Sequence, residues 1–122
     1  MTTDQKNEID SLALAIVAAK AADDKQADDI IILPVGDILA ITEYFVVASA
    51  SNKRLVRAVA DEILGVVRTT TGRSPLRSEG VSEHEWILID YGDIVVHIFG
   101  EETRRFYEIE RLYKDVVAVD WK

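Results

Sequence analysis

The sequence has 122 residues, two histidines, no cysteine and a formal net charge of −8 at pH 7. That length fits one compact domain, and a composition with 48% hydrophobic and 30% charged residues is typical of a globular chain. The absence of cysteine excludes disulfides, thiolate nucleophiles and zinc–thiolate sites. The 22 acidic against 14 basic residues disfavour binding to nucleic-acid phosphates or an anionic membrane and favour a basic partner.

The N-terminal segment has none of the features of a targeting signal. Residues 1–10 contain acids and a single basic residue, whereas a signal peptide begins basic and then becomes apolar. Every apolar run is far shorter than the roughly 20 residues that span a bilayer. We therefore expect a soluble, cytoplasmic protein with a flexible N-terminus over residues 1–6 and a single domain over residues 7–122.

The first half of the chain contains two helical and two extended patterns. Apolar residues at helical spacing predict a helix over residues 7–24. β-Branched residues over 30–33 predict a strand buried on both faces, and a second strand is expected over 44–48. The next helix is expected over 52–68, with Ser51 or Asn52 as its N-cap.

The second half begins with a loop and then forms a hairpin. Residues 69–80 are rich in Gly, Ser and Pro and predict a loop, in which residues 76–77 can make a short edge strand. Strands are expected over 86–90 and 93–99, joined by a two-residue turn at Tyr91-Gly92. A last helix is expected over 101–114 with Phe106 on its buried side, and the tail is apolar enough to pack or pair.

The order of these elements indicates the fold class. Helix, strand, strand, helix, strands and helix predict an α/β fold: a small single-domain mixed β-sheet with flanking helices. The short spacing between the first two strands leaves their relative direction open.

The register of the predicted hairpin determines which side chains share a face of the sheet. With the turn at Tyr91-Gly92, Asp90 pairs with Asp93, and side chains alternate between the two faces. One face is then entirely aliphatic and must be core. The other face mixes large apolar groups, two acids and a histidine: Trp86, Leu88, Asp90, Asp93, Val95, His97 and Phe99.

Two interpretations of this mixed face carry equal weight. As an interface, Trp86 is the residue type typical of binding hot spots. The stretch from Ser78 to Thr103 has no Lys or Arg but seven acids, beginning with Glu79, which would steer a basic partner. As ordinary core, the face is covered by a helix and Trp86 anchors it.

The sequence shows no motif that indicates an enzyme. His84 and His97 lack a trusted metal-ligand spacing, and there is neither a phosphate-binding glycine pattern nor a G-x-S-x-G elbow. Asp90 and Asp93 are better explained as turn residues than as a metal-binding pair. We therefore expect no enzymatic activity, no cofactor and no metal.

Two motifs near the C-terminus occur in a specific order. The hairpin sequence DYGDIVVHIF over residues 90–99 is followed by E-x-R-x-FY-x-IE-x-L over 102–112. Together with ITEYFVV over residues 41–47 and Trp86 six residues after Gly80, they resemble the ribosomal silencing factor family, also called RsfS or Iojap. The resemblance extends from about Leu12 to Val117.

The resemblance implies a nucleotidyltransferase-like α/β fold without known transferase activity. It also implies binding to the large ribosomal subunit through ribosomal protein fourteen, L14, which blocks association of the subunits and represses translation under nutrient limitation. In the family the contact surface includes the hairpin region. The expected partner-binding residues are therefore Trp86, Leu88, Asp90, Tyr91, Asp93, Val95, His97, Phe99 and Glu79.

Two alternatives stay open beside this expectation. One is a metal-dependent nucleotidyltransferase-type enzyme that uses Asp90 and Asp93 with Mg²⁺. The other is a self-associating domain whose hairpin face closes a homodimer. Under the leading expectation, the protein makes no sequence-specific contact with nucleic acid and none with a membrane.

Overall fold

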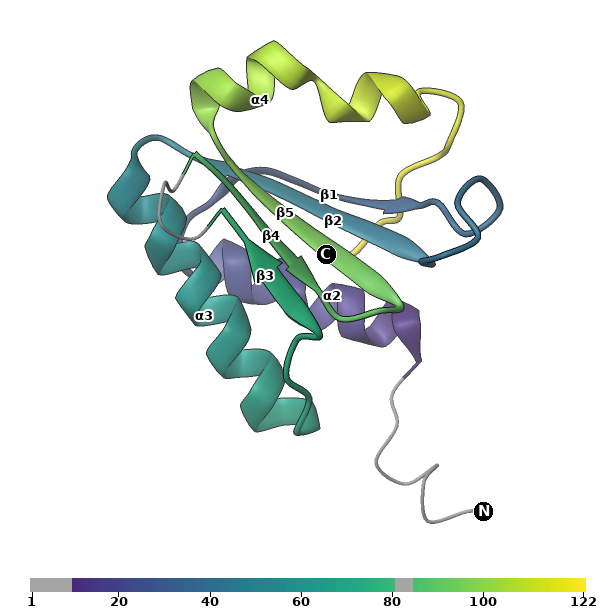
Figure 1. Ribbon diagram of the computed structural model, residues 1–122, viewed down its shortest axis with the longest axis horizontal. Coiled ribbons are helices and arrows are strands. Elements are labelled where there is room, and N and C mark those ends of the chain that lie inside the picture. Colours follow the sequence, from purple (N-terminus) through teal and green to yellow (C-terminus); the bar gives the residue numbers. More distant parts are fainter. Residues whose placement is uncertain (1–9, 81–84) are drawn as a thin grey trace.

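The computed structural model describes residues 10–80 and 85–122, which form a five-stranded mixed sheet with helical segments on both faces (Figure 1). The strands lie in the order β1-β2-β5-β4-β3, and only β2 and β5 run parallel. Their bounds are β1 Asp28–Pro34, β2 Tyr44–Ala50, β3 Arg77–Glu79, β4 Trp86–Asp90 and β5 Ile94–Gly100. The predicted α/β class is confirmed, whereas the flexible segment predicted over 1–6 lies outside the described residues, as do residues 7–9 of the first expected helix and His84.

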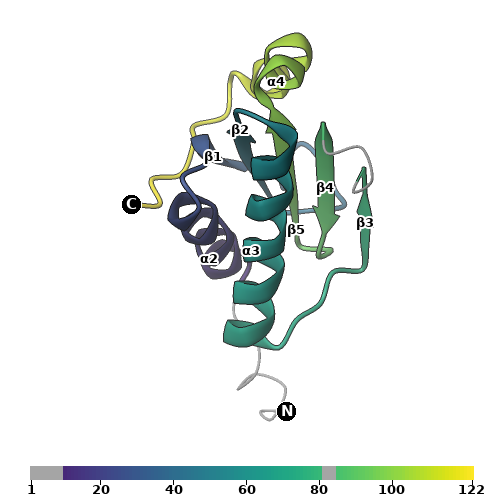
Figure 2. The ribbon, with the colours of Figure 1, turned by 90° about the vertical axis from the view of Figure 1, so that its left-hand side faces the viewer.

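One face of the sheet is covered by α2 (Ser11–Asp24) and α3 (Lys53–Thr71), which pack side by side (Figure 2). Each helix begins at a side chain that accepts a backbone N–H: Asp10 caps α2, and Asn52 caps α3. Alanines of α2 let the helix approach the sheet closely. The aliphatic face of the hairpin, predicted to be core, is buried beneath the two helices. The buried residues of this core include Ala15, Ala18, Ala22, Ile32, Val46, Ile63, Ile87, Ile89, Ile94, Val96 and Ile98.

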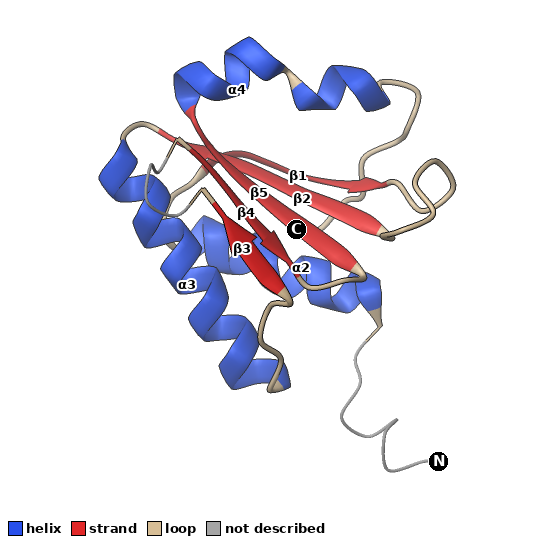
Figure 3. Cartoon of the chain, viewed as in Figure 1, coloured by secondary structure: helices blue, strands red, loops and turns tan. Residues whose placement is uncertain are grey.

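The opposite face is partly covered by α4 (Glu101–Tyr107) and the 3₁₀-helix η1 (Ile109–Tyr113). The single helix predicted over 101–114 is wrong, because Glu108 takes a left-handed conformation, φ 47°, and ends α4 (Figure 3). The spacing that places side chains on one face of a continuous helix does not hold on the two sides of a left-handed residue. Phe106 is therefore 80% exposed, contrary to the prediction, while Ile109 is buried. None of the described helices is long and apolar enough to cross a membrane.

The hairpin turn lies one residue later than predicted. The Tyr91 N–H donates to the Ile94 carbonyl, 3.0 Å away, so the two turn residues are Gly92-Asp93. Gly92 has φ +95°, which a hairpin turn with glycine in its first central position requires. The register consequently moves by two residues, and Asp90 pairs with Val95 instead of Asp93. Because a shift of two preserves the alternation of side chains, the assignment of the strand residues to faces still holds.

The C-terminal tail lies along the outer edge of β1. The Val119 N–H donates to the Ile32 carbonyl at 2.9 Å, and the Trp121 indole N–H donates to the Ile30 carbonyl at 3.2 Å. The prediction that the tail packs or pairs is confirmed. These bonds occupy backbone acceptors that an edge strand would otherwise offer to another chain.

Candidate partner-docking surface

Trp86 lies at the start of β4, between solvent and a second cluster of buried residues. We call this cluster the second core; it comprises Leu33, Val35, Phe45, Val47, Phe99 and Ile109. Its half-buried indole packs on Phe99, with ring centroids 4.8 Å apart, and on Tyr107 of α4, at 4.9 Å. The indole N–H donates to Nδ1 of His97 over 3.2 Å. The ring is thus held on one side by buried aromatic groups and remains partly accessible on the other.

Two aromatic residues of α4 extend this accessible region. Phe106 is 80% exposed and Tyr107 is 52% exposed, and their rings meet edge to face at 5.0 Å. We call Trp86, Phe106 and Tyr107 the aromatic surface. The two α4 residues are not among the predicted partner-binding residues, because helical periodicity assigned Phe106 to the core. The signal that could have identified them is their place in the second motif that resembles the family.

The candidate residues of the mixed face divide between the two interpretations. Phe99 is fully buried and His97 is 4% exposed, so a helical segment does cover this part of the face. Val95 also packs against the second core. Trp86 and Leu88 are half-buried and remain partly open to solvent. His97 and Phe99 therefore belong to the core. Trp86 and Leu88 form the partly accessible rim next to it.

Tyr91 lies in the core on the side of α2 and α3. It is 2% exposed, and within the described ranges its hydroxyl has no hydrogen-bond partner. Burial raises the pKa of Tyr91 to about 12. The structure therefore places this candidate away from the aromatic surface.

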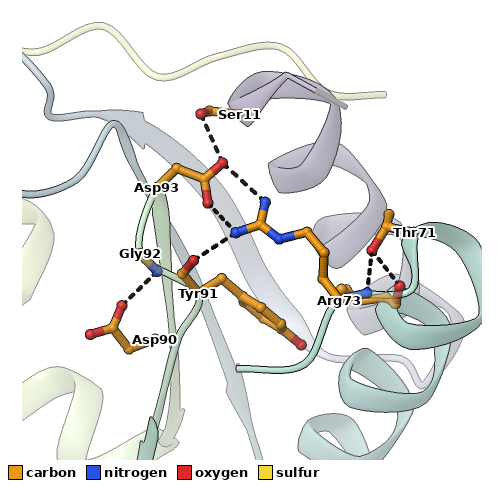
Figure 4. Close-up of polar contacts among 8 residues, drawn as sticks. Ser11, Thr71, Arg73, Asp90, Tyr91, Gly92 and Asp93 are labelled. Carbon is orange, nitrogen blue, oxygen red and sulfur yellow. Dashed lines mark hydrogen bonds and ion pairs between the residues drawn. The ribbon is translucent and has the colours of Figure 1, made fainter. Parts of the chain in front are cut away.

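Asp93, in the hairpin turn, belongs to a polar cluster with Arg73 and Ser11 (Figure 4). Arg73 donates to both of its carboxylate oxygens, at 2.8 and 3.1 Å, and also to the Tyr91 carbonyl at 2.7 Å. The Ser11 hydroxyl of α2 donates to the same carboxylate at 3.0 Å. Burial alone would raise the pKa of Asp93, but the hydrogen bonds from Arg73 and Ser11 outweigh it and hold that pKa below its usual range.

Asp90 has different partners from Asp93. It accepts the Gly92 N–H at 2.8 Å, and its second oxygen accepts from Arg77 at 3.2 Å. Each carboxylate thus neutralises its own arginine in the described structure. Within residues 10–80 and 85–122, no three or more His, Asp or Glu side chains are grouped so as to hold a metal ion. The contacts of Asp90 and Asp93 support the turn interpretation over the Mg²⁺ pair.

The acidic stretch is partly neutralised by basic residues from outside it. Arg77 of β3 forms ion pairs with both Asp90 and Glu79, which lies exposed on the same strand. Lys53, at the start of α3, lies 3.6 Å from Glu85. The charge that the stretch offers to a partner is therefore smaller than its sequence indicates. The aromatic surface is the more distinctive feature of this region.

We expect the buried imidazole of His97 to make stability depend on pH. Burial lowers its pKa from 6.5 to about 4. Between these values the unfolded chain binds a proton that the folded chain does not, so the free energy of unfolding falls as the pH drops from 6.5 to 4. The loss should reach about 3 kcal/mol at 1.36 kcal/mol per pH unit. It is absent above this window, where both states are neutral.

Urea denaturation at a series of pH values measures this effect. The variant His97→Phe keeps a planar ring and removes the titrating group, so it serves as the reference for carboxylates that titrate in the same range. The difference in unfolding free energy between the two proteins should change with pH only between about 4 and 6.5. A difference that stays constant across that window would contradict the expectation.

Comparison with known proteins shows which family the chain resembles. The family model described as "Ribosomal silencing factor during starvation" matches residues 8–122. The ribosomal silencing factor RsfS of Bacillus subtilis is 36% identical over 104 residues, which cover 85% of this chain and 87% of that protein. A crystal structure of a Chromobacterium violaceum protein superimposes with a TM-score of 0.82 at 29% identity, covering 87% of this chain and 88% of that one.

A more distant relative carries a related name. The mouse protein "Mitochondrial assembly of ribosomal large subunit protein 1" is 30% identical over 91 residues, which cover 73% of this chain and 40% of that protein. The family match spans nearly the whole sequence, including every described strand and helix. The chain therefore belongs to the ribosomal silencing factor family.

Proposed function

We propose that this protein acts in the cytoplasm, binding the large ribosomal subunit through L14 and sterically blocking association of the subunits, which represses translation under nutrient limitation. The observation that carries the proposal is the aromatic surface, because two exposed aromatic rings beside a half-buried tryptophan are unusual on a protein that has no partner. Family membership and the name of the mouse relative support a ribosomal partner on the large subunit.

The proposed action requires binding and no catalysis. Aromatic rings bury large apolar areas and attract Lys and Arg side chains through their faces, which suits a basic ribosomal protein. The acids near the hairpin add long-range attraction that salt weakens, although the ion pairs with Arg73, Arg77 and Lys53 limit its size. Once docked, the rest of the domain would occupy space that the small subunit needs.

Sedimentation and light scattering with purified subunits test the proposal. We expect the protein to sediment with large subunits and not with small ones, and to lower the light-scattering signal of subunit joining in proportion to the amount bound. An excess of free L14 should displace it from the large subunit. Sedimentation without any effect on joining, or displacement by unrelated basic proteins as readily as by L14, would contradict the proposal.

The control variant for the docking surface is Ile41→Ala. Ile41 is 84% exposed and lies just before β2, whose first residue, Tyr44, pairs with Ile94 at the start of β5. Trp86 pairs with Phe99 near the end of β5. The control therefore removes an exposed apolar side chain from the opposite end of that strand, and it should bind like the wild type.

Self-association through the same aromatic surface is the alternative proposal. It would make the surface inaccessible in a homodimer and leave subunit joining unaffected at concentrations where the dimer forms. Light scattering over a range of protein concentrations distinguishes the two, because a homodimer shows a mass that rises with concentration.

A further inference from the structure

His97 is a buried polar residue in an otherwise apolar and aromatic setting. Its ring meets Phe45 edge to face, with centroids 4.6 Å apart, and stacks with Phe99 at 6.1 Å. It is 4% exposed, and among the described residues only the Trp86 indole forms a hydrogen bond with its ring, at Nδ1. The other ring nitrogen, Nε2, is buried without a partner in the described structure.

The hydrogen bond determines the chemical state of the imidazole. An indole N–H can only donate, so Nδ1 must accept, and the proton of the neutral ring must lie on Nε2. That buried N–H without a partner costs stability, which a phenylalanine at this position would not. Packing alone therefore does not explain a histidine here, whereas the acceptor for Trp86 does.

Fixing the Trp86 ring has a consequence for binding. An aromatic side chain that is free to rotate loses conformational entropy when a partner immobilises it, whereas a ring already held in its bound orientation does not. Phe99 and Tyr107 restrict the ring by packing. The bond to His97 adds a directional constraint, because it holds the N–H edge of the indole toward the buried imidazole.

We propose that His97 is a positioning residue for partner binding: by accepting the indole N–H, it holds Trp86 in the orientation in which the aromatic surface meets the ribosomal partner. This inference rests on the proposed function. His97 is only 4% exposed, so its effect on affinity would act through the orientation of Trp86.

A double-mutant cycle measures that effect. His97→Phe keeps a ring for the contacts with Phe45 and Phe99 but removes the acceptor, and Trp86→Phe keeps an aromatic ring but removes the N–H. We expect His97→Phe to weaken binding to the large subunit by about fivefold, the value of one neutral hydrogen bond. In the Trp86→Phe background the same substitution should change binding by less than about twofold. Equal losses in both backgrounds would show a merely structural role and overturn the proposal.

The free protein provides a readout that does not depend on the ribosome. The indole N–H of Trp86 should exchange with solvent faster, and its NMR signal should move, in His97→Phe. The indole of Trp121 is an internal reference, since it donates to the Ile30 carbonyl and should not change. His97→Asn, whose amide oxygen lies close to the place of Nδ1, should restore part of the protection. An unchanged Trp86 signal in His97→Phe would overturn the proposal.

The outcomes separate this inference from the function on which it rests. If the wild type does not bind the large subunit, the proposed function fails, and with it the docking role of His97. If the wild type binds and His97→Phe binds equally well, only the positioning role fails.

Discussion

The variant Trp86→Ala is expected to bind the large ribosomal subunit about 30-fold more weakly than the wild type, a loss of about 2 kcal/mol. Trp86 is the tryptophan of the aromatic surface and contacts both the buried Phe99 and Tyr107. Truncation removes the contact area of the indole and leaves Tyr107 with only one of its two aromatic neighbours, Phe106. Titration of labelled protein with purified large subunits, followed by sedimentation, gives the affinity.

Two controls make this result interpretable. Urea denaturation establishes that Trp86→Ala is folded at the temperature of the assay, because part of the indole is buried. Ile41→Ala, just before β2 and near the start of β5, removes a more exposed apolar side chain far from the aromatic surface and should keep the affinity of the wild type. If the folded Trp86→Ala variant is recovered with large subunits as well as the wild type is, Trp86 is not a contact residue.

The variant Arg104→Met is expected to lower the free energy of unfolding by about 3 kcal/mol. Arg104 is 7% exposed and connects α4 to the edge of the sheet: it donates to the Asp29 carbonyl at 2.6 Å and to the Ser49 hydroxyl at 3.2 Å. It also forms an ion pair with Glu110 of η1 at 3.2 Å. Methionine fills much of the volume but removes the donor from all three acceptors. Ser49 is buried at 2% exposure, and a buried polar group that loses its partner is costly.

The neighbouring arginine supplies the matched control. Arg105 is exposed on the same helix, so Arg105→Met changes the charge equally and should alter stability by less than about 0.5 kcal/mol. Arg104→Lys keeps the charge but cannot reproduce the planar set of donors, and should lie between the wild type and Arg104→Met. Urea denaturation of all three variants decides the matter: equal stability of the Arg104 and Arg105 variants would mean that the buried contacts contribute nothing.

The hairpin shows why faces are easier to predict than register. Side chains alternate along a strand whatever it pairs with, so the aliphatic face containing Ile87 and Val96 follows from the order of residues alone. The turn position depends on which residue can take a positive φ, and both Tyr91-Gly92 and Gly92-Asp93 contain the glycine. In the observed turn, Gly92-Asp93, the Asp93 carboxylate bonds to Arg73 and Ser11. Both partners are distant in the sequence, so the local pattern does not indicate them.

The final helix shows where periodicity stops being informative. The pattern over 101–114 is helical on both sides of Glu108, but that residue is left-handed and divides it into α4 and η1. Side chains of α4 that were predicted to face the core can then face solvent. Phe106 consequently belongs to the accessible surface, although its spacing from Ile109 resembles that of two core residues.

The sequence by itself determined the α/β class, the strands, the first two helices, the aliphatic core face and the two motifs that resemble the family. These follow from local properties: alternation, helical spacing and the order of residues along the chain. Only the tertiary structure decided how much of the mixed face is covered, which acids are neutralised, and which aromatic residues reach solvent. Those depend on contacts between segments that are separated in the sequence, such as Arg77 with Asp90 and Trp86 with Tyr107, and such contacts leave no periodic signal in either segment.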